Sequence, residues 1–382
     1  MTSKQTLPEP CADAHAHSQR VHKHICQLID IHGPLTFHDY MQAALYSPGL
    51  GYYSAGSTKF GPAGDFTTAP ELSPLFGRSI AKQCIEILHG MKSPTILELG
   101  AGSGALAISL LQELKHHNKL PDHYYILDVS ADCRQRQQHR FLQQAPELLS
   151  RVTWLDRLPE EPIQGIILAN EVLDAMPVHK FLYTPSRLDE YHVTHHHETL
   201  SWEVLPCADA ALERAVNHLN IQSNQPYHSE INLALPSWIK HLSQCLSQGL
   251  ILLIDYGFPR QEFYFPERHM GTLMCHYQHR AHDNPLVFPG IQDITAHVDF
   301  TAIAEAAFEN ALTVAGYTHQ AAFLASCGIH DLIQQEPSNN TSNIHTLLHP
   351  SEMGELFKCI ALTRQIDHPL LGFQLLNQVE RL

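Results

Sequence analysis

A glycine-rich segment, Glu98-Leu-Gly-Ala-Gly-Ser-Gly104, carries the clearest chemical signal in this chain. It follows an apolar run at residues 95–99 and precedes an apolar-periodic segment at 105–116, so it is expected to join a buried strand to a helix. Its glycines allow a sharp turn and a close approach of the backbone to a ligand, and a helix N-terminus offers free amide donors to a carboxylate or a phosphate. The segment therefore predicts a ligand-binding turn.

Two cofactors fit this turn. Gly100, Gly102 and Gly104 match the Gly-x-Gly-x-Gly pattern that is usual in S-adenosylmethionine (SAM) methyltransferases, and together with Ala105 they also fit the looser dinucleotide pattern. No Lys-Ser or Lys-Thr pair follows, which argues against a nucleoside triphosphate site. Asp128 closes a second apolar run and can accept hydrogen bonds from the ribose hydroxyls of either cofactor. A tight turn without any ligand is the remaining alternative.

A polar pair, Asn170-Glu171, ends the apolar run at residues 165–169. Open α/β sheets bind ligands beyond the carboxyl ends of their strands, so this pair is expected to face the reactive end of the cofactor. A hydride-transfer site would more often show a Tyr/Lys or His/Asp constellation, and none stands out in the sequence. Ordinary loop-capping residues are the alternative reading of the pair. Methyl transfer is the favoured interpretation.

The elements that must position these residues follow a regular order from residue 94 onward. Strand-like runs alternate with helix-periodic segments, which predicts βαβ units and a parallel sheet covered on both faces. We therefore predict an α/β fold with a doubly wound, mostly parallel sheet. The alternation lapses over about 178–230 and again over about 257–297, which indicates two insertions. Strands are expected at 95–99, 124–129, 152–155, 165–169 and 250–255, and helices at 105–116, 132–143, 237–247 and 301–315.

The first 92 residues are interpreted as an N-terminal helical cap with a lid loop, and residues 93–382 as a Rossmann-like domain with insertions. Thr36 and Asp39 form a capping pair for a helix at 37–46, and Ser73 followed by proline starts another that runs to about Gly90. A Gly/Pro-rich stretch at 47–72 lies between them. The run His195-His196-His197 separates two strand-like segments, so it is expected to form a hairpin loop, with metal binding as the weaker alternative.

Composition excludes several classes of protein. Among 382 residues the formal net charge is −15, which speaks against a general nucleic-acid binder. No apolar run is long enough to cross a membrane, and the first residues contain no apolar segment of the signal-peptide type. Nine cysteines form no Cys-x-x-Cys pair, so we predict no metal site and a reducing, cytoplasmic location.

The chain resembles a known family, the mitochondrial complex I assembly-factor methyltransferases and their bacterial relatives (the MidA-like family). The resemblance covers about residues 35–330. Its motifs include Gly51-Tyr-Tyr53, Phe60-Gly-Pro-Ala-Gly-Asp-Phe-Thr-Thr-Ala-Pro-Glu71, the segment from Glu98 to Ala107, Ala169-Asn-Glu-Val-Leu-Asp-Ala-Met-Pro-Val178, Glu230-Ile-Asn232, Ile254-Asp-Tyr-Gly257, Gly271-Thr-Leu273 and Pro289-Gly-Ile-Gln-Asp-Ile-Thr-Ala-His-Val-Asp-Phe300. Asp128 departs from the pattern, since relatives commonly carry Glu there, but either carboxylate can bind a ribose diol.

The resemblance implies a SAM-dependent protein methyltransferase that dimethylates an arginine on the quinone-side subunit of complex I and aids assembly of the complex. A non-catalytic assembly chaperone with a vestigial SAM site, and a nicotinamide-dependent oxidoreductase, remain alternatives. The residues expected to bind the cofactor are Gly64, Asp65, Thr67, Thr68, Glu98, Gly100, Ala101, Gly102, Gly104, Asp128, Ser130, Leu155 and Asn170.

An arginine substrate requires carboxylates, because the guanidinium pKa lies above about 12 and a proton must leave as the new bond forms. Glu171 is the first candidate, Glu230 the second, and Asn170 is expected beside them. Glu230 could equally be a surface or capping carboxylate. The next candidates are Asp174, Asp255 and Asp293, and for Asp255 a role in supporting the fold is at least as good a reading.

Overall fold

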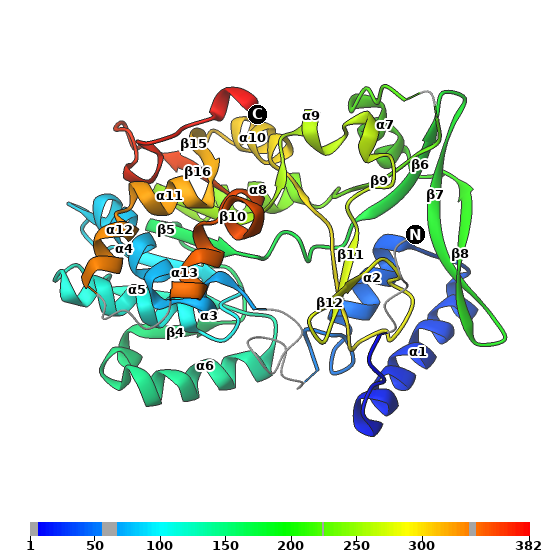
Figure 1. Cartoon of the computed structure of the whole chain (residues 1–382), viewed down its shortest axis with the longest axis horizontal. Coiled ribbons are helices and arrows are strands. Elements are labelled where there is room, and N and C mark those ends of the chain that lie inside the picture. The colour runs from blue at the N-terminus through cyan, green and yellow to red at the C-terminus, as the bar shows by residue number, and fades with distance from the viewer. Residues whose placement is uncertain (1–6, 56–66, 224, 336–340) are drawn as a thin grey trace. The chain divides into compact units, whose positions relative to one another are not determined.

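The computed structural model describes residues 7–55, 67–223, 225–335 and 341–382 (Figure 1). Contacts divide the chain into two compact units. The sheet unit contains residues 67–173, 234–260 and 298–382, and the insertion unit contains residues 1–66, 174–233 and 261–297. Each unit is described by itself.

The sheet unit is built on an eight-stranded sheet with the order β15-β16-β10-β5-β2-β3-β4, and β14 pairs with the end of β10. The five strands from β10 to β4 are parallel, whereas β16 runs antiparallel to both of its neighbours. The strands are β2 Thr95–Leu99, β3 His123–Leu127, β4 Val152–Leu155, β5 Ile163–Asn170, β10 Leu246–Phe258, β14 Val298–Asp299, β15 Thr313–His319 and β16 Phe357–Arg364. This is the predicted doubly wound α/β fold.

Helices bury the apolar faces of this sheet. Ile96, Ile166 and Leu252 join a core with residues of α4 and α5 such as Ile80 and Leu110, all at most 2% exposed. The helices are α3 Ala69–Leu72, α4 Pro74–Leu88, α5 Ala105–His116, α6 Ala131–Gln144, α8 Leu235–Gln244, α10 Phe300–Glu309, α11 Gln320–Ser326, α12 Ile329–Gln335 and α13 Thr341–Leu348. Short helical turns are η1 Pro146–Arg151, η3 Pro350–Gly354, η4 Leu371–Phe373 and η5 Val379–Arg381. Helix α9 Arg260–Phe263 spans a boundary between the units.

The strand order reverses at β2. From β2 the chain adds β3 and then β4 on one side, and returns to place β5 on the other side. Leu99, the last residue of β2, pairs with Ala169 near the end of β5. The segments after Leu99 and Ala169 therefore leave the sheet side by side at the switch point, where open α/β sheets bind their ligands.

The insertion unit combines the N-terminal segment with both predicted insertions. One of its sheets has the order β1-β7-β6-β9, and β8 also pairs with β7. A second sheet has the order β12-β11-β13. Its elements are α1 Ala12–His32, β1 Leu35–Thr36, α2 Phe37–Tyr46, β6 His179–Thr184, β7 Arg187–His196, β8 Thr199–Pro206, α7 Ala210–His218, β9 Tyr227–Ile231, η2 Pro266–Arg268, β11 Met274–Tyr277, β12 Arg280–His282 and β13 Asp293–Thr295.

Several local predictions hold at residue level. Thr36 caps α2 by accepting a hydrogen bond of 3.1 Å from the Asp39 amide, and Ser73 caps α4. A hairpin does form at the histidine run, but its two-residue turn is His197 and Glu198, both at positive φ, while His195 and His196 pair within β7. The strand at 124–129 ends earlier than predicted, at Leu127, and the helix at 301–315 ends at Glu309.

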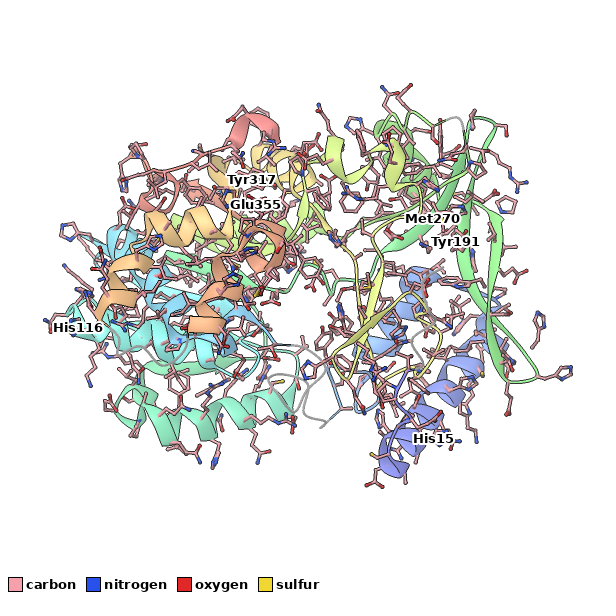
Figure 2. All side chains as sticks on the ribbon, viewed as in Figure 1. His15, His116, Tyr191, Met270, Tyr317 and Glu355 are labelled. Atoms are coloured by element: carbon pink, nitrogen blue, oxygen red, sulfur yellow. The ribbon has the colours of Figure 1, made fainter. Side chains whose placement is uncertain are left out.

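The division into units differs from a boundary at residue 92. Helix α4 belongs to the sheet unit and not to an N-terminal cap, because its apolar face, including Leu75, Ile80 and Cys84, is buried in the core of the sheet unit. The last 50 residues supply β16, which lies between β10 and β15. Within the described ranges, no helix is both long and apolar enough to span a bilayer. Many histidines are solvated, such as His15 on α1 and His116 on α5 (Figure 2).

Candidate functional site

The glycine segment forms the turn that its sequence predicts. Gly100, Gly102 and Gly104 have φ angles of 63°, 54° and 83°, which L side chains rarely adopt. A Cβ at residue 100 would also lie 2.9 Å from Cγ2 of Val172. Gly104 is the N-cap of α5 and has no side chain to occupy the helix N-terminus. The Ser103 hydroxyl of the turn accepts a 3.3 Å hydrogen bond from the Ala105 amide, the first amide of the helix. The positive end of α5 still suits a carboxylate-bearing or phosphate-bearing ligand.

Asn170 and Glu171 lie beside this turn, because β5 pairs with β2 up to Leu99 and Ala169. Glu171 has a φ of 54°, a strained conformation for a residue with a side chain, of a kind that concentrates at functional sites. Its Oε1 accepts hydrogen bonds from the Asn170 amide at 3.1 Å and from the Ala69 backbone at 3.3 Å. Oδ1 of Asn170 is buried and, within the described ranges, has no hydrogen-bond partner. A buried acceptor without a donor is costly, so this atom fits a ligand that brings a donor.

Asp255 holds the backbone that follows the pair. It is fully buried at the end of β10, and its Oδ2 accepts hydrogen bonds from the Val172 amide at 3.1 Å and the Leu173 amide at 2.9 Å. Its Oδ1 accepts a third bond from the Tyr256 amide at 2.9 Å. The carboxylate is thus committed to backbone donors, which agrees with the reading of Asp255 as a supporting residue.

Asp128 follows β3 directly, and one neighbouring side chain fixes its orientation. Gln137 on α6 donates to Oδ2 of Asp128 at 2.8 Å and to the carbonyl of Gly102 at 2.9 Å, and it accepts a bond of 2.8 Å from the Trp154 indole. The Ser130 amide donates to Oδ1 of Asp128 at 2.9 Å, while the Ser130 hydroxyl caps α6. Gln137 therefore ties the glycine turn to the carboxylate that is expected to bind a ribose.

Glu98 is buried within the sheet, where its carboxylate accepts a 2.7 Å hydrogen bond from the Tyr124 hydroxyl. Desolvation by burial raises the pKa of Glu98 to about 7, and the nearby charge of Asp128 adds to the rise while the bond from Tyr124 opposes it. This placement makes Glu98 a buried support beneath the turn, since only 2% of its surface is exposed.

The segment at Thr67 and Thr68 leads into α3, which is tied to the glycine turn. Glu71 of α3 accepts hydrogen bonds from the Ser103 hydroxyl of the turn and from Arg140 of α6, the latter at 2.6 Å. Arg140 also donates to the Ser103 hydroxyl at 2.5 Å. Gly64 and Asp65, the other two predicted cofactor residues of this loop, lie outside the described residues.

Apolar surface is available at the edge of the site. Val129, directly after Asp128, has 77% of its surface exposed, and Leu155 at the end of β4 is half-buried. Strands β3 and β4 are paired up to Leu127 and Leu155, so both residues lie at the carboxyl edge of the sheet. Leu155 is one of the residues expected to bind the cofactor, whereas the exposure of Val129 is visible only in the structure.

Glu230 has different surroundings. It belongs to the insertion unit, whereas Glu171 belongs to the sheet unit, so the catalytic role expected of Glu230 beside Glu171 stays a prediction. The carboxylate is 1% exposed and forms a 2.6 Å ion pair with Lys180. It also accepts a 2.8 Å hydrogen bond from the Thr272 amide. A side chain at residue 271 would overlap the carboxylate, which explains why glycine stands there, at a φ of 80°.

The two remaining candidates are also placed in the insertion unit. Asp293 is buried and accepts a 2.8 Å hydrogen bond from the Tyr53 hydroxyl. The backbone carbonyl of Asp174 accepts a bond from the Ala296 amide at 2.9 Å. Gln137 and Arg140 carry no signal in the sequence, because their bonds to Gly102 and Glu71 join segments that are distant in the chain.

Comparisons with known proteins identify the cofactor of this chain. A family model described as "Putative S-adenosyl-L-methionine-dependent methyltransferase" matches residues 79–318, more than half of the chain. A crystal structure from Burkholderia thailandensis that holds S-adenosyl-homocysteine is 39% identical and superposes with a TM-score of 0.94, covering 99% of this chain and 100% of that one. A native crystal structure from the same organism is also 39% identical, with a TM-score of 0.91.

Curated relatives carry a more specific name. The Drosophila melanogaster homolog of the protein arginine methyltransferase NDUFAF7 is 28% identical, covering 98% of this chain and 93% of the relative. The human NDUFAF7 is 28% identical, covering 89% of this chain and 82% of the relative. These findings decide between the two cofactors in favour of SAM. SAM fits the glycine turn, Asp128 and the buried Oδ1 of Asn170, which no described residue meets with a hydrogen bond.

Proposed function

Because the chain belongs to this family of SAM-dependent methyltransferases, we propose that it methylates an arginine side chain of a protein. The observation that carries the proposal is the position of Glu171. Its carboxylate leaves the sheet beside the glycine turn, at the switch point where open α/β sheets generally bind their ligands. The names of the curated relatives support arginine as the acceptor.

SAM supplies a methyl group on a sulfonium, and the residues of the chain hold the acceptor in line with it. A carboxylate matches the planar donors of a guanidinium, so Glu171 can orient the acceptor nitrogen. The same carboxylate favours the loss of a proton as the nitrogen becomes methylated. Asn170 donates to Glu171 and leaves its buried Oδ1 for a donor of the cofactor. The strained backbone of Glu171 is held in place by a hydrogen bond of 2.9 Å that its amide donates to the Ile254 carbonyl.

We further propose that the acceptor protein is the quinone-side subunit of complex I and that the modification aids assembly in the cytoplasm. The support is the MidA-like resemblance, whose eukaryotic members act as complex I assembly factors. The motifs that carry this resemblance include the segments that form the site, from Glu98 to Ala107 and from Ala169 to Val178.

The test is methyl transfer from SAM to the purified quinone-side subunit, with mass spectrometry to locate the methyl groups. The proposal requires dimethylation of one arginine by the wild-type chain and its loss in Glu171→Gln. Methylation of a different residue type would refute the arginine assignment. Tight SAM binding without transfer to the subunit would instead favour the assembly-chaperone alternative.

A further inference from the structure

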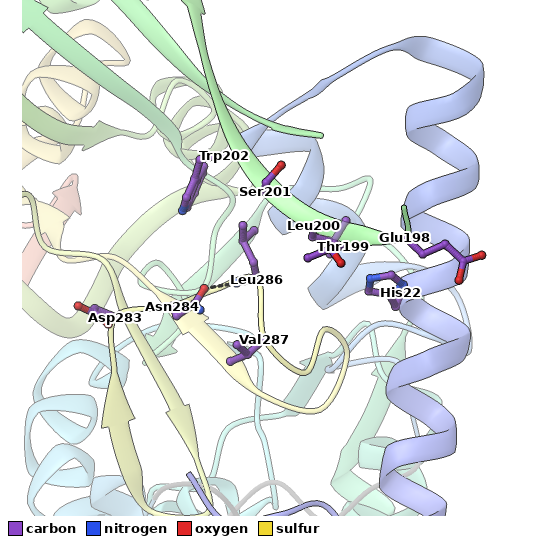
Figure 3. Close-up of a pocket in the computed structure, with 10 residues that line it drawn as sticks. All are labelled: His22, Glu198, Thr199, Leu200, Ser201, Trp202, Asp283, Asn284, Leu286 and Val287. Carbon is purple, nitrogen blue, oxygen red and sulfur yellow. Dashed lines mark hydrogen bonds between the residues drawn. The ribbon is translucent and has the colours of Figure 1, made fainter. Parts of the chain in front are cut away.

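The insertion unit contains a pocket of about 800 Å³ that the cofactor site does not involve (Figure 3). Three segments of that unit line it. They are α1 through His22, the β7–β8 turn with the first half of β8, and the segment at 283–287 that follows β12. All three belong to the insertion unit, so the pocket is formed within one compact body.

The β8 strand offers an open edge at this pocket. It pairs with β7 from Thr199 to Pro206, and in the part of the chain that the structure describes it pairs with no other strand. The four consecutive residues 199–202 all line the pocket. Because successive side chains of a strand point to opposite faces, a pocket that reaches all four also reaches the strand backbone. An extended peptide can bind there by adding a strand.

The apolar part of the pocket is pre-formed. The ring of Trp202 lies 5.2 Å from the ring of Phe37 and 5.4 Å from the ring of Tyr191, which fixes its orientation. Leu200 and Leu286 pack with Trp202 against the core of the insertion unit. Figure 3 shows Trp202 and Leu286 directed into the same space. A fixed indole ring is a good surface for a guanidinium, which stacks on its face.

The charge of the pocket selects a cation. Glu198 and Asp283 are exposed carboxylates on its lining, and neither forms an ion pair with another described residue. The described residues that line the pocket include no lysine or arginine, and the chain carries a net charge of −15. A second copy of this chain would bring more negative charge to these carboxylates, whereas a basic segment would neutralise them.

We propose that this pocket docks an extended, arginine-containing segment of the protein substrate, which pairs with β8 and places a guanidinium between Trp202 and Asp283. The identification of that partner as the substrate rests on the proposed function. The docking itself follows from the open strand edge, the fixed indole and the two carboxylates.

The test is binding of a fluorescent eight-residue peptide of alternating arginine and valine to the full chain, measured by polarisation. Two matched peptides serve as probes, one with glutamate in place of arginine and one with alternate backbone amides methylated. We expect each to bind at least about tenfold more weakly, because one loses charge complementarity and the other loses strand pairing. The double variant Glu198→Gln/Asp283→Asn should show the same loss for the original peptide.

The control is Glu213→Gln/Glu267→Gln, which removes two exposed carboxylates of the insertion unit away from the pocket lining and should bind like wild type. Equal weakening of peptide binding in both double variants would show general charge attraction and overturn the proposal. Unchanged binding of the methylated peptide would show that no strand pairing occurs and would also overturn it. So would a concentration-dependent dimer that only the pocket variant loses. Binding needs no methyl transfer, so docking can hold even if the arginine assignment fails.

Discussion

Glu171 and Glu230 are the first two candidate catalytic carboxylates for an arginine substrate, and they differ in exposure and in hydrogen-bond partners. Glu171 is partly exposed, sits on strained backbone and lies next to a buried acceptor that has no partner in the described ranges. Glu230 is 1% exposed. Its carboxylate forms an ion pair with Lys180 and accepts hydrogen bonds from the backbone amide and the hydroxyl of Thr272. A buried carboxylate whose hydrogen-bonding capacity is filled by the protein stabilises the fold. A partly exposed carboxylate next to a buried acceptor without a donor is available to a ligand.

The largest effect is expected at Glu171. Glu171→Gln keeps the shape of the side chain but removes the charge that orients a guanidinium, so methyl transfer at saturating SAM should fall by roughly 10²–10⁴-fold. SAM affinity should change little, because the glycine turn and Asp128 remain. Calorimetric titration with SAM and the rate of methyl incorporation measure the two quantities separately. Near-normal transfer would reduce Glu171 to a loop residue, and lost SAM binding would place it against the cofactor instead of the acceptor.

Glu230 should respond in the opposite way. Glu230→Gln leaves the Lys180 ammonium buried without its counter-ion, which costs about 3–5 kcal/mol of unfolding free energy for a buried pair. Lys180→Met with Glu230→Gln removes both charges and should recover most of that loss. Urea unfolding of the wild type and the two variants gives the free energies. If Glu230→Gln unfolds like wild type but transfers methyl slowly, Glu230 is catalytic and the contrast with Glu171 fails.

The sequence predicts those features of the site that depend on neighbours in the chain. The strand, glycine turn and helix from Thr95 to His116 follow from local periodicity and glycine spacing, and α5 begins and ends at the predicted residues. The position of Asn170 and Glu171 follows from the general geometry of parallel sheets, because strand ends at a switch point lie together.

Pairings between distant segments could not be predicted. Lys180 meets Glu230 only because β6 and β9 pair in register, and Thr272 reaches the same carboxylate from a third segment. The strand β16 enters the sheet between β10 and β15, although all local signals would allow it at an edge. The insertion unit likewise assembles from three separated segments, and no local periodicity in the sequence encodes that association.

Glu98 offers a third kind of carboxylate, buried and bonded to a phenol instead of a cation. Burial raises its pKa to about 7, so between pH 5 and pH 7 the folded chain holds a proton that the unfolded chain has lost. The unfolding free energy therefore decreases as pH rises through this window. Compared with Glu98→Gln, the wild type should lose about 2–3 kcal/mol between pH 5 and pH 8 in the absence of SAM. Parallel pH profiles of the two proteins would contradict this assignment.

The smallest effect tests how the sheet unit orients its ligand. Gln137→Leu removes the bonds to Asp128 and to the Gly102 carbonyl and leaves the Trp154 indole without its acceptor. We expect S-adenosyl-homocysteine to bind about tenfold more weakly, a loss of about 1.4 kcal/mol.

A merely structural role of Gln137 would weaken the binding of all adenosine ligands equally. A role in orienting Asp128 should weaken the ribose form but not its 2′,3′-dideoxy analogue, because only the former uses the carboxylate. Trp154→Phe is the matched control, since it removes one bond to Gln137 and leaves Asp128 oriented. Equal losses for both ligands in Gln137→Leu would show that Gln137 only packs the core, and the cofactor region would then resemble the saturated surroundings of Glu230 more closely than proposed.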